Sequence, residues 1–189
     1  MSDDARLIAE TLAGQTAAFG KLVEKYQDRL FNTVLHLAGN VEDARDVVQE
    51  AFVQAFVKLD SFRGSSAFYT WLYRIAFNIS AGWRRKRKPT GSIDRNGEQI
   101  GLDPMDNGDG PVEQLERQEQ CLQVRRALGQ LSDEHRKILV LREIDGCDYE
   151  TIAEILDLPV GTVRSRLHRA RMELREELKE GLEVRGRKG

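Results

Sequence analysis

Four arginines are concentrated within eight residues near the C-terminal end of the sequence. They are Arg164, Arg166, Arg169 and Arg171, in the stretch PVGTVRSRLHRAR at 159–171. A guanidinium group binds phosphates and can form two hydrogen bonds with the edge of a guanine base, so this pattern predicts contact with DNA. The whole chain is slightly acidic, with 29 Lys and Arg residues against 31 Asp and Glu. Local fields decide contact with nucleic acid, so the acidic total does not oppose this prediction.

The arginine-rich stretch is expected to form the second helix of a helix-turn-helix. Asp148 is a favourable N-cap for a short helix over 149–156, and DLPV then turns the chain into a last helix that begins at Pro159 or Val160. Apolar residues at helical spacing predict its buried stripe: Val163, Leu167, Ala170, Leu174 and Leu178. The side chains expected to face outward are those of Arg164, Ser165, His168, Arg169 and Arg171, with Arg166 at the flank.

A solvated charged helix is the alternative interpretation of these arginines, because most charge runs only face water. The distribution of acids favours DNA instead. Glu173, Glu176 and Glu177 occur only in the second half of the helix, so its first half contains no acid that could pair with the arginines there.

The N-terminal half predicts a bundle of helices. Apolar residues recur at helical spacing from 19 to 37, and Asn40 is a good N-cap for a second helix with acidic residues in its first turn. SFRGSS at 61–66 predicts a loop, and a further helix runs from about Ala67 to the basic run RRKRK at 84–88. Neither Val/Ile alternation nor an Asn-Gly hairpin turn occurs, so we expect an all-α fold.

The helix that begins near Ala67 carries a second candidate site. Its core stripe is predicted to contain Phe68, Trp71, Leu72, Ile75 and Ile79. Aromatic and basic residues alternate away from this stripe, at Tyr69, Thr70, Tyr73, Arg74, Phe77, Asn78, Arg84, Arg85 and Lys88. Rings can stack on unpaired bases while cations hold the nucleic-acid backbone. The alternative is that these aromatics only pack inside the bundle.

The helix after Asn40 predicts a third surface. Opposite its core side, acids and amides are followed by two valines at helical spacing: Asp46, Gln49, Glu50, Val53 and Val57. Exposed valines beside acids are typical of a protein-docking face. Two isolated surface valines are the alternative interpretation.

Residues 88–111 interrupt the helical pattern with prolines, glycines and acids. A stretch of this length without structure does not belong inside a compact domain, so we expect a linker. The chain is therefore divided into two small helical domains, 1–88 and 112–189, joined by an acidic flexible linker at 89–111. In the second domain, Ser132 is expected to cap a helix that Gly146 ends.

Several classes of protein are excluded by the composition. Cys121 and Cys147 show no CxxC spacing, so neither a disulfide framework nor a zinc site is expected. The three histidines, His36, His135 and His168, lie on different predicted helices, and no phosphate loop or nucleophile motif occurs. We expect no catalytic residue, metal or cofactor. The N-terminus is acidic and no apolar run could span a bilayer, which predicts a cytoplasmic protein.

Two long stretches, DVVQEAFVQAFVKLDSFRGSSAFYTWLYRIAFN (46–78) and LREIDGCDYETIAEILDLPVGTVRSRLHRAR (141–171), resemble sigma factors of bacterial RNA polymerase. The resemblance is to the extracytoplasmic function (ECF) group, in particular its sigma-E-like members. It implies a sigma region 2 bundle at 1–88 and a sigma region 4 helix-turn-helix at 112–189. The function implied is a transcription initiation factor that directs polymerase to promoters and helps open the DNA, in a stress or envelope response.

The resemblance also implies a role for each candidate site. The residues expected to read the minus-35 element are Thr162, Arg164, Ser165, Arg166, His168, Arg169 and Arg171, although relatives often carry an aromatic residue at the place of His168. Those expected to recognise and melt the minus-10 element are Ser65, Ser66, Phe68, Trp71, Tyr73, Arg74, Asn78, Arg84 and Arg85. Those expected to bind core polymerase are Asp46, Gln49, Glu50, Phe52 and Val53.

The partners implied are core RNA polymerase, through its β′ coiled coil and β flap, promoter DNA and an anti-sigma factor; no small-molecule substrate is expected. A DNA-binding repressor or response regulator is the first alternative, but the N-terminal half offers no ligand pocket or phospho-acceptor domain. An enzyme is the second, and it lacks a candidate catalytic group.

Overall fold

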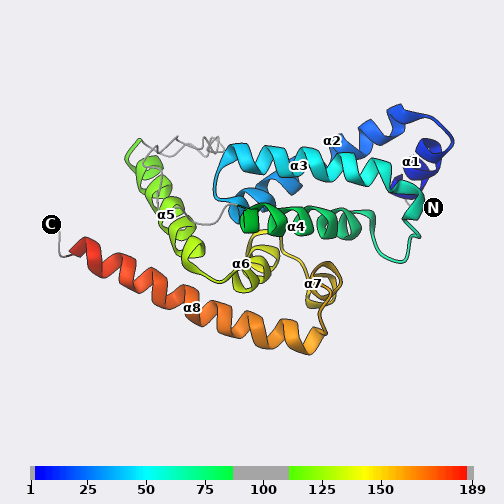
Figure 1. Ribbon diagram of the computed structural model, residues 1–189. Helices are drawn as coiled ribbons and strands as arrows, with labels where there is room; N and C mark the ends of the chain where they lie inside the picture. Colours follow the sequence, from blue (N-terminus) through cyan, green and yellow to red (C-terminus); the bar gives the residue numbers. More distant parts are fainter. Residues whose placement is uncertain (1–2, 87–110, 187–189) are drawn as a thin grey trace.

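The computed structural model describes residues 3–86 and 111–186, and at 83–86, 111–118 and 181–186 it describes the backbone alone. The predicted linker, except Pro111, and Lys88 lie outside the described residues. The described residues are helical apart from short turns and loops, which confirms the expected all-α fold (Figure 1).

The N-terminal half is a bundle in which α4 packs against α2 and α3. Its N-caps follow from local sequence: the Asn40 side chain accepts a hydrogen bond of 2.8 Å from the Asp43 N–H, as predicted, and Gly39 ends the preceding helix at φ 86°. An additional helix precedes the predicted ones and buries Leu7 against the bundle. The elements are α1 (Asp3–Leu12), α2 (Thr16–Ala38), α3 (Val41–Val57), the 3-10 turn η1 (Leu59–Ser61) and α4 (Phe68–Lys86).

The C-terminal half contains the predicted helix-turn-helix and one irregularity. Ser132 and Asp148 cap their helices as expected. The single helix expected from Ser132 to Gly146 instead changes to π geometry, and the Asp145 N–H donates to the carbonyl of Val140, five residues earlier. The elements are α5 (Pro111–Gln130), α6 (Asp133–Leu139), η2 (Val140–Ile144), α7 (Tyr149–Leu156) and α8 (Val160–Gly186).

A buried arginine joins two of these helices. Arg136 is 4% exposed, and its guanidinium donates to three carbonyls at the end of α5. The distances are 2.6 Å to Leu128 O, 2.8 Å to Gly129 O and 2.9 Å to Leu131 O. Carbonyls at a helix C-terminus lack partners inside the helix and carry partial negative charge, so they suit a cation.

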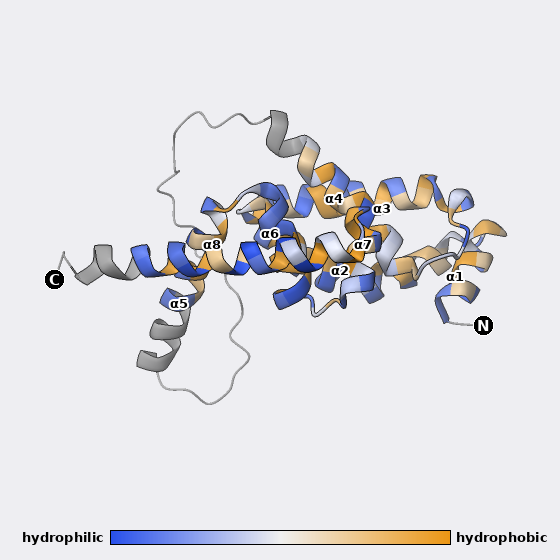
Figure 2. Ribbon diagram, turned by 90° about the horizontal axis from the view of Figure 1, so that it is seen from below, coloured by the Kyte–Doolittle hydropathy of each residue, from blue (hydrophilic) through white to orange (hydrophobic). Residues whose placement is uncertain are grey.

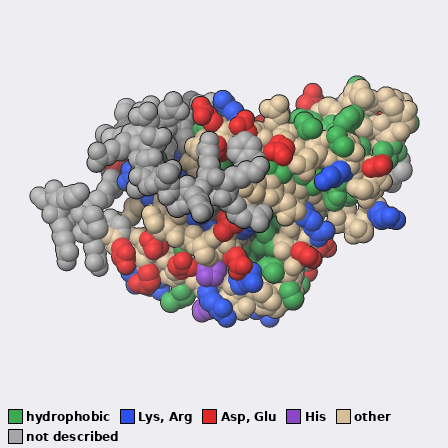
Figure 3. Space-filling model, viewed as in Figure 1, with side chains coloured by type: hydrophobic (Ala, Val, Ile, Leu, Met, Phe, Trp, Pro, Cys, Tyr) green, Lys and Arg blue, Asp and Glu red, His purple; other side chains and the backbone are tan. Residues whose placement is uncertain are grey.

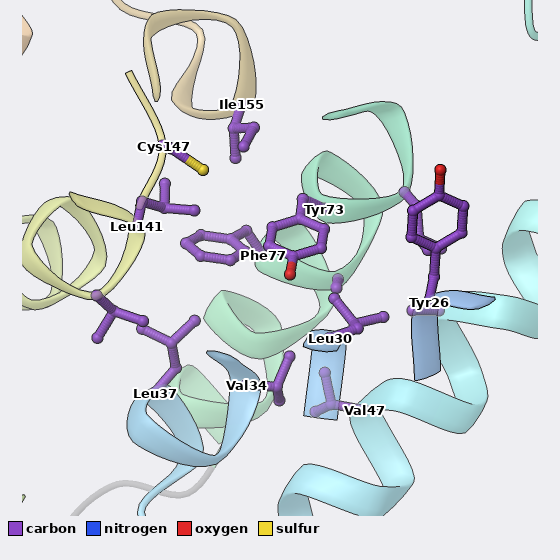
Figure 4. Packing of buried hydrophobic residues seen from close by; sticks show 14 of the residues in the cluster. Tyr26, Leu30, Val34, Leu37, Val47, Tyr73, Phe77, Leu141, Cys147 and Ile155 are labelled. Atoms are coloured by element: carbon purple, nitrogen blue, oxygen red, sulfur yellow. The ribbon is translucent and has the colours of Figure 1, made fainter. Parts of the chain in front are cut away.

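The two halves pack against each other through α4 and α7, and their buried side chains form one hydrophobic cluster. Phe77 of α4 points toward Leu141 and Cys147 of the C-terminal half (Figure 4). All three side chains are almost fully buried. The α4 helix is therefore covered by the N-terminal bundle on one side and by α7 on the other.

Candidate nucleic-acid interfaces and docking groove

The predicted recognition face lies on the outer side of α8. Val163, Leu167 and Ala170 are fully buried, while Arg164, His168 and Arg169 are exposed. Seen from below, the ribbon of α8 crosses the molecule and carries many hydrophilic residues (Figure 2). Along the edge where α8 runs, acidic side chains gather toward the C-terminus, whereas histidine and basic side chains lie nearer its start (Figure 3).

Two of the predicted arginines pair with acids from other elements. Arg166 lies 3.0 Å from a carboxylate oxygen of Glu134 in α6, and Arg171 lies 2.6 Å from one of Glu143 in η2. The hydrogen bonds that Arg171 donates to the Glu143 carboxylate raise the pKa of Arg171. The first half of α8 itself contains no acid, as the sequence shows, but acids of α6 and η2 pair with these two arginines. Within the described residues, no acid pairs with Arg164 or Arg169.

Tyr149, the first residue of α7, positions part of this face. Its ring lies beneath two guanidinium groups, with ring-centroid distances of 5.2 Å to Arg142 and 5.9 Å to Arg164. Cation–π contact of this kind contributes about 0.5–1 kcal/mol at exposed sites. Arg142 is held in turn by a hydrogen bond of 2.8 Å to the Cys147 carbonyl. The first helix of the helix-turn-helix therefore orders an arginine of the second.

An aromatic cluster fixes the loop that precedes α4. Phe62 lies 5.8 Å from Phe68 and 5.2 Å from Trp71 between ring centroids, so the loop is held at both ends. Ser65 is exposed and Ser66 is half-buried at the tip of this loop. Phe68 is 2% exposed and packs in the core, while Trp71 is half-buried.

The remaining minus-10 candidates on α4 are divided between surface and interior. Arg74 and Asn78 are exposed, but Tyr73 is completely buried beneath the C-terminal half. Burial raises the pKa of the Tyr73 hydroxyl, which therefore stays protonated and acts as a donor. The side chains of Arg84 and Arg85, at the end of α4, lie outside the described residues.

Asp145 is a functional candidate that the sequence did not reveal. Its side chain is only 3% exposed, and both carboxylate oxygens accept hydrogen bonds of 3.0 Å from Arg29. The Tyr73 hydroxyl donates to the same carboxylate at 3.0 Å. Arg29 and Asp145 are separated by 116 positions, so no local pattern could have indicated the pair.

The predicted docking face of α3 borders an apolar groove between α2 and α3. Val53 and Phe56 on its rim are 56% and 43% exposed. Phe52, at its floor, is only 7% exposed. Asp46 and Glu50 lie beside the groove and not in its lining, and Val57 is also outside it. The lining residues are Phe19, Val23, Gln27, Asp28, Phe31, Arg45, Val48, Gln49, Phe52, Val53 and Phe56. The contribution of α2 was missed because only the α3 face was considered.

Two regions of the chain match known families that correspond to these two halves. Residues 22–90 match "Sigma-70 region 2", and residues 121–174 match "Sigma-70, region 4". The ECF RNA polymerase sigma-E factor of Escherichia coli is 39% identical over 178 residues, covering 89% of this chain and 90% of that protein. The chain is an ECF sigma factor of the sigma-70 family.

Two further relatives support the same family assignment. The RNA polymerase sigma-H factor of Pseudomonas aeruginosa is 38% identical over 173 residues, covering 89% of this chain and 90% of its own. The ECF sigma factor SigW of Bacillus subtilis is 35% identical over 178 residues, covering 92% and 95%. The resemblance predicted from sequence is therefore confirmed, and the protein is a non-enzymatic factor that directs RNA polymerase to promoters.

Two solved structures are similar over most of this sigma factor. CnrH in complex with the cytosolic domain of CnrY has a TM-score of 0.70 and 28% identity, covering 95% of this chain and 99% of that one. The sigma factor RpoE of Bartonella quintana in complex with the anti-sigma factor NepR has a TM-score of 0.64 and 29% identity, covering 85% and 96%.

The part of the sigma factor that the structure describes offers neither a metal site nor a membrane-spanning helix. It contains no cluster of His, Cys, Asp and Glu that could hold a metal ion. No helix in the same ranges is long and apolar enough to cross a membrane. His135 pairs with Glu173 between α6 and α8, and His36 is largely buried, which lowers its pKa to about 4.

Proposed function

We propose that this sigma factor docks on core polymerase through the groove between α2 and α3, and reads two promoter elements with α8 and α4. The observation that carries the proposal is the outer face of α8, where Arg164, His168 and Arg169 stand exposed above a buried stripe. Such a face fits the major groove, where arginine discriminates guanine. The domain limits proposed are 1–88 for region 2, 89–111 for the linker and 112–189 for region 4.

The roles proposed for the individual sites follow their position. The exposed α8 side chains contact the minus-35 element, with Arg166 and Arg171 held beside them by Glu134 and Glu143. The loop at 62–67 and the exposed part of α4 contact the minus-10 element and aid its melting. The groove receives an apolar ridge of the β′ coiled coil, and region 4 contacts the β flap.

The proposal includes regulation by an anti-sigma factor in a stress or envelope response. It places the sigma factor in the cytoplasm. Support comes from the two similar structures, CnrH with CnrY and the Bartonella RpoE with NepR, since each contains a bound partner. A groove rimmed by Val53 and Phe56 leaves apolar surface exposed in the free chain, and an inhibitor that covers it would also exclude polymerase.

Run-off transcription tests the proposal as a whole. Core polymerase, the full-length protein and a genomic promoter library are combined, and transcripts are sequenced. We expect a set of transcripts whose upstream regions share two spaced elements, absent when the protein is omitted. A complete lack of protein-dependent transcripts would refute the proposal.

Arg169→Ala tests the minus-35 assignment. Losing a guanidinium that reads a base costs about 1–3 kcal/mol, which corresponds to about fivefold to about 150-fold weaker promoter binding by the holoenzyme. Core polymerase binding should stay unchanged. Arg175→Ala, an exposed arginine further along α8, is the matched control. Equal loss of polymerase binding and promoter binding would show that Arg169 serves the fold.

A further inference from the structure

The first helix, α1, lies at the end of the bundle where the chain passes from α3 to α4 (Figure 1). It packs along α2 and also contacts η1, the turn that leads into the loop at 62–67. Leu7 and Ile8 bury its apolar side. None of the residues that line the docking groove or carry the proposed promoter contacts belongs to α1. Its contacts therefore point to a different role.

A carboxylate of α1 orients a tyrosine of α2. The Tyr26 hydroxyl donates to Asp4 Oδ2 at 2.6 Å. The other oxygen of Asp4 pairs with the Lys25 ammonium, which also lies 5.2 Å from the centre of the Tyr26 ring. Burial raises the pKa of Tyr26 to about 12, and the hydrogen bond to Asp4 adds to this shift. The hydroxyl therefore stays protonated at neutral pH and acts as a donor.

The ring of Tyr26 extends this contact to the loop before α4. Its centroid lies 5.7 Å from that of Phe68, the first residue of α4. Phe68 lies 5.8 Å from Phe62, and Phe62 lies 5.2 Å from Trp71. Close-packed rings favour particular relative orientations, so a displaced ring shifts its neighbours. A continuous path of contacts thus joins Asp4 to the two rings that bound the loop.

The loop between these rings takes its position from its ends. Ser65 is exposed and Ser66 is half-buried at its tip, and Gly64 has a φ of 67°, which favours glycine. The Phe62 N–H donates to the Leu59 carbonyl of η1 at 3.1 Å. Loops that carry function are positioned by the elements that flank them. Both flanks of this loop are in contact with α1, one through η1 and the other through Tyr26.

Two adjacent carboxylates of α1 differ in what they hold. Asp3 pairs with Arg6 of its own helix at 2.7 Å, and its side chain is 61% exposed. The Asp4 side chain is 18% exposed and pairs across to α2. Both acids lie in the first turn, where negative charge stabilises a helix. Only Asp4 links α1 to the ring contacts that reach the loop.

We infer that Asp4 and Tyr26 are positioning residues for the loop at 62–67, and that α1 thereby sets how selectively this loop reads the minus-10 element. The DNA contact of the loop rests on the proposed function, whereas the positioning rests on the contacts within the chain. Neither side chain needs to touch DNA, because each acts through Phe68 and Phe62. A recognition loop discriminates between bases only when the side chains that support it hold it in one geometry.

Hydrogen exchange of the free, full-length protein tests the positioning. Tyr26→Phe keeps the ring and removes only the hydroxyl that donates to Asp4. Amides of the loop at 62–67 should exchange about threefold or more faster in Tyr26→Phe and in Asp4→Ala, because the lost hydrogen bond to a charged acceptor no longer opposes local opening. Asp4→Asn keeps an oxygen acceptor and should restore most of the protection. Asp3→Ala, the matched control, should exchange like the wild type.

The second measurement uses the holoenzyme on a promoter found by run-off transcription, with single base substitutions in each element. The wild type should distinguish the native base from a substituted one by about fivefold to about 150-fold. Tyr26→Phe should lower this ratio at the minus-10 element by about threefold or more. The ratio at the minus-35 element and the affinity for core polymerase should not change. A protein that is only less stable would give less transcript from every promoter and leave both ratios intact.

Four results would overturn the inference. They are unchanged exchange of the loop in Tyr26→Phe and Asp4→Ala, equal effects of Asp3→Ala and Asp4→Ala, faster exchange without a change in the minus-10 ratio, and an equal fall of both ratios. If the wild-type holoenzyme makes no transcript, the proposed function fails, while the exchange measurement still decides whether Asp4 and Tyr26 position the loop.

Discussion

Arg136→Ala is expected to destabilise the C-terminal half by about 3 kcal/mol, since three carbonyls, two of them in buried hydrogen bonds, would lose a charged donor and alanine leaves a cavity. The carbonyls are those of Leu128, Gly129 and Leu131. A loss of this size is a large part of the total stability of a small domain.

Two optical signals separate this effect from general unfolding. Both tryptophans, Trp71 and Trp83, lie in α4, so their emission reports the N-terminal half. Heating or urea should reduce the far-ultraviolet circular dichroism of Arg136→Ala well before the tryptophan emission changes. Arg136→Met keeps most of the packing volume, and it should still show most of the loss of stability expected for Arg136→Ala. Arg175 is exposed, so Arg175→Ala should lose little stability. Equal unfolding midpoints for Arg136→Met and wild type would contradict the capping role.

Val53→Asp is expected to abolish most binding to core polymerase. A central apolar contact of a protein interface contributes about 2 kcal/mol or more, so its replacement by a charge should weaken binding by about 30-fold or more. Val53 lines the groove between α2 and α3 and is 56% exposed, so the substitution should not disturb the fold. The measurement is binding of labelled protein to core polymerase, together with thermal unfolding.

Val57→Asp is the matched control for that experiment. Val57 lies on the same helix and is more exposed, at 72%, but it is not part of the groove lining. Polymerase binding by Val57→Asp should stay near that of the wild type. If the two substitutions weakened binding equally, the docking surface would be the whole outer face of α3 and not the groove.

The sequence predicted the features that depend on neighbouring residues. The caps at Asn40, Ser132 and Asp148 are local hydrogen bonds over three residues, so residue type and position suffice to predict them. The buried stripe of α8 follows from helical periodicity in the same way. Residue-by-residue assignment of the promoter contacts remains a prediction.

Features that join distant parts of the chain were not predictable in this way. Glu134 and Glu143 neutralise arginines of α8 from other elements, and Asp145 meets Arg29 across 116 positions. The π turn was also missed, because a helix that tightens or widens by one residue keeps nearly the same apolar pattern. The sequence of α4 also does not show that its second face is buried, because the helix that covers it, α7, lies far along the chain.

The two cysteines give the native sigma factor its own pair of chemical probes. Cys121 is exposed on α5, whereas Cys147 is buried behind Asp145, and burial raises the pKa of its thiol to about 12. Alkylating reagents attack the thiolate, so at neutral pH the first cysteine reacts as an internal reference and the second is protected. Mass spectrometry of the unmodified chain can therefore report whether the packing that buries Cys147 is intact, without an engineered label.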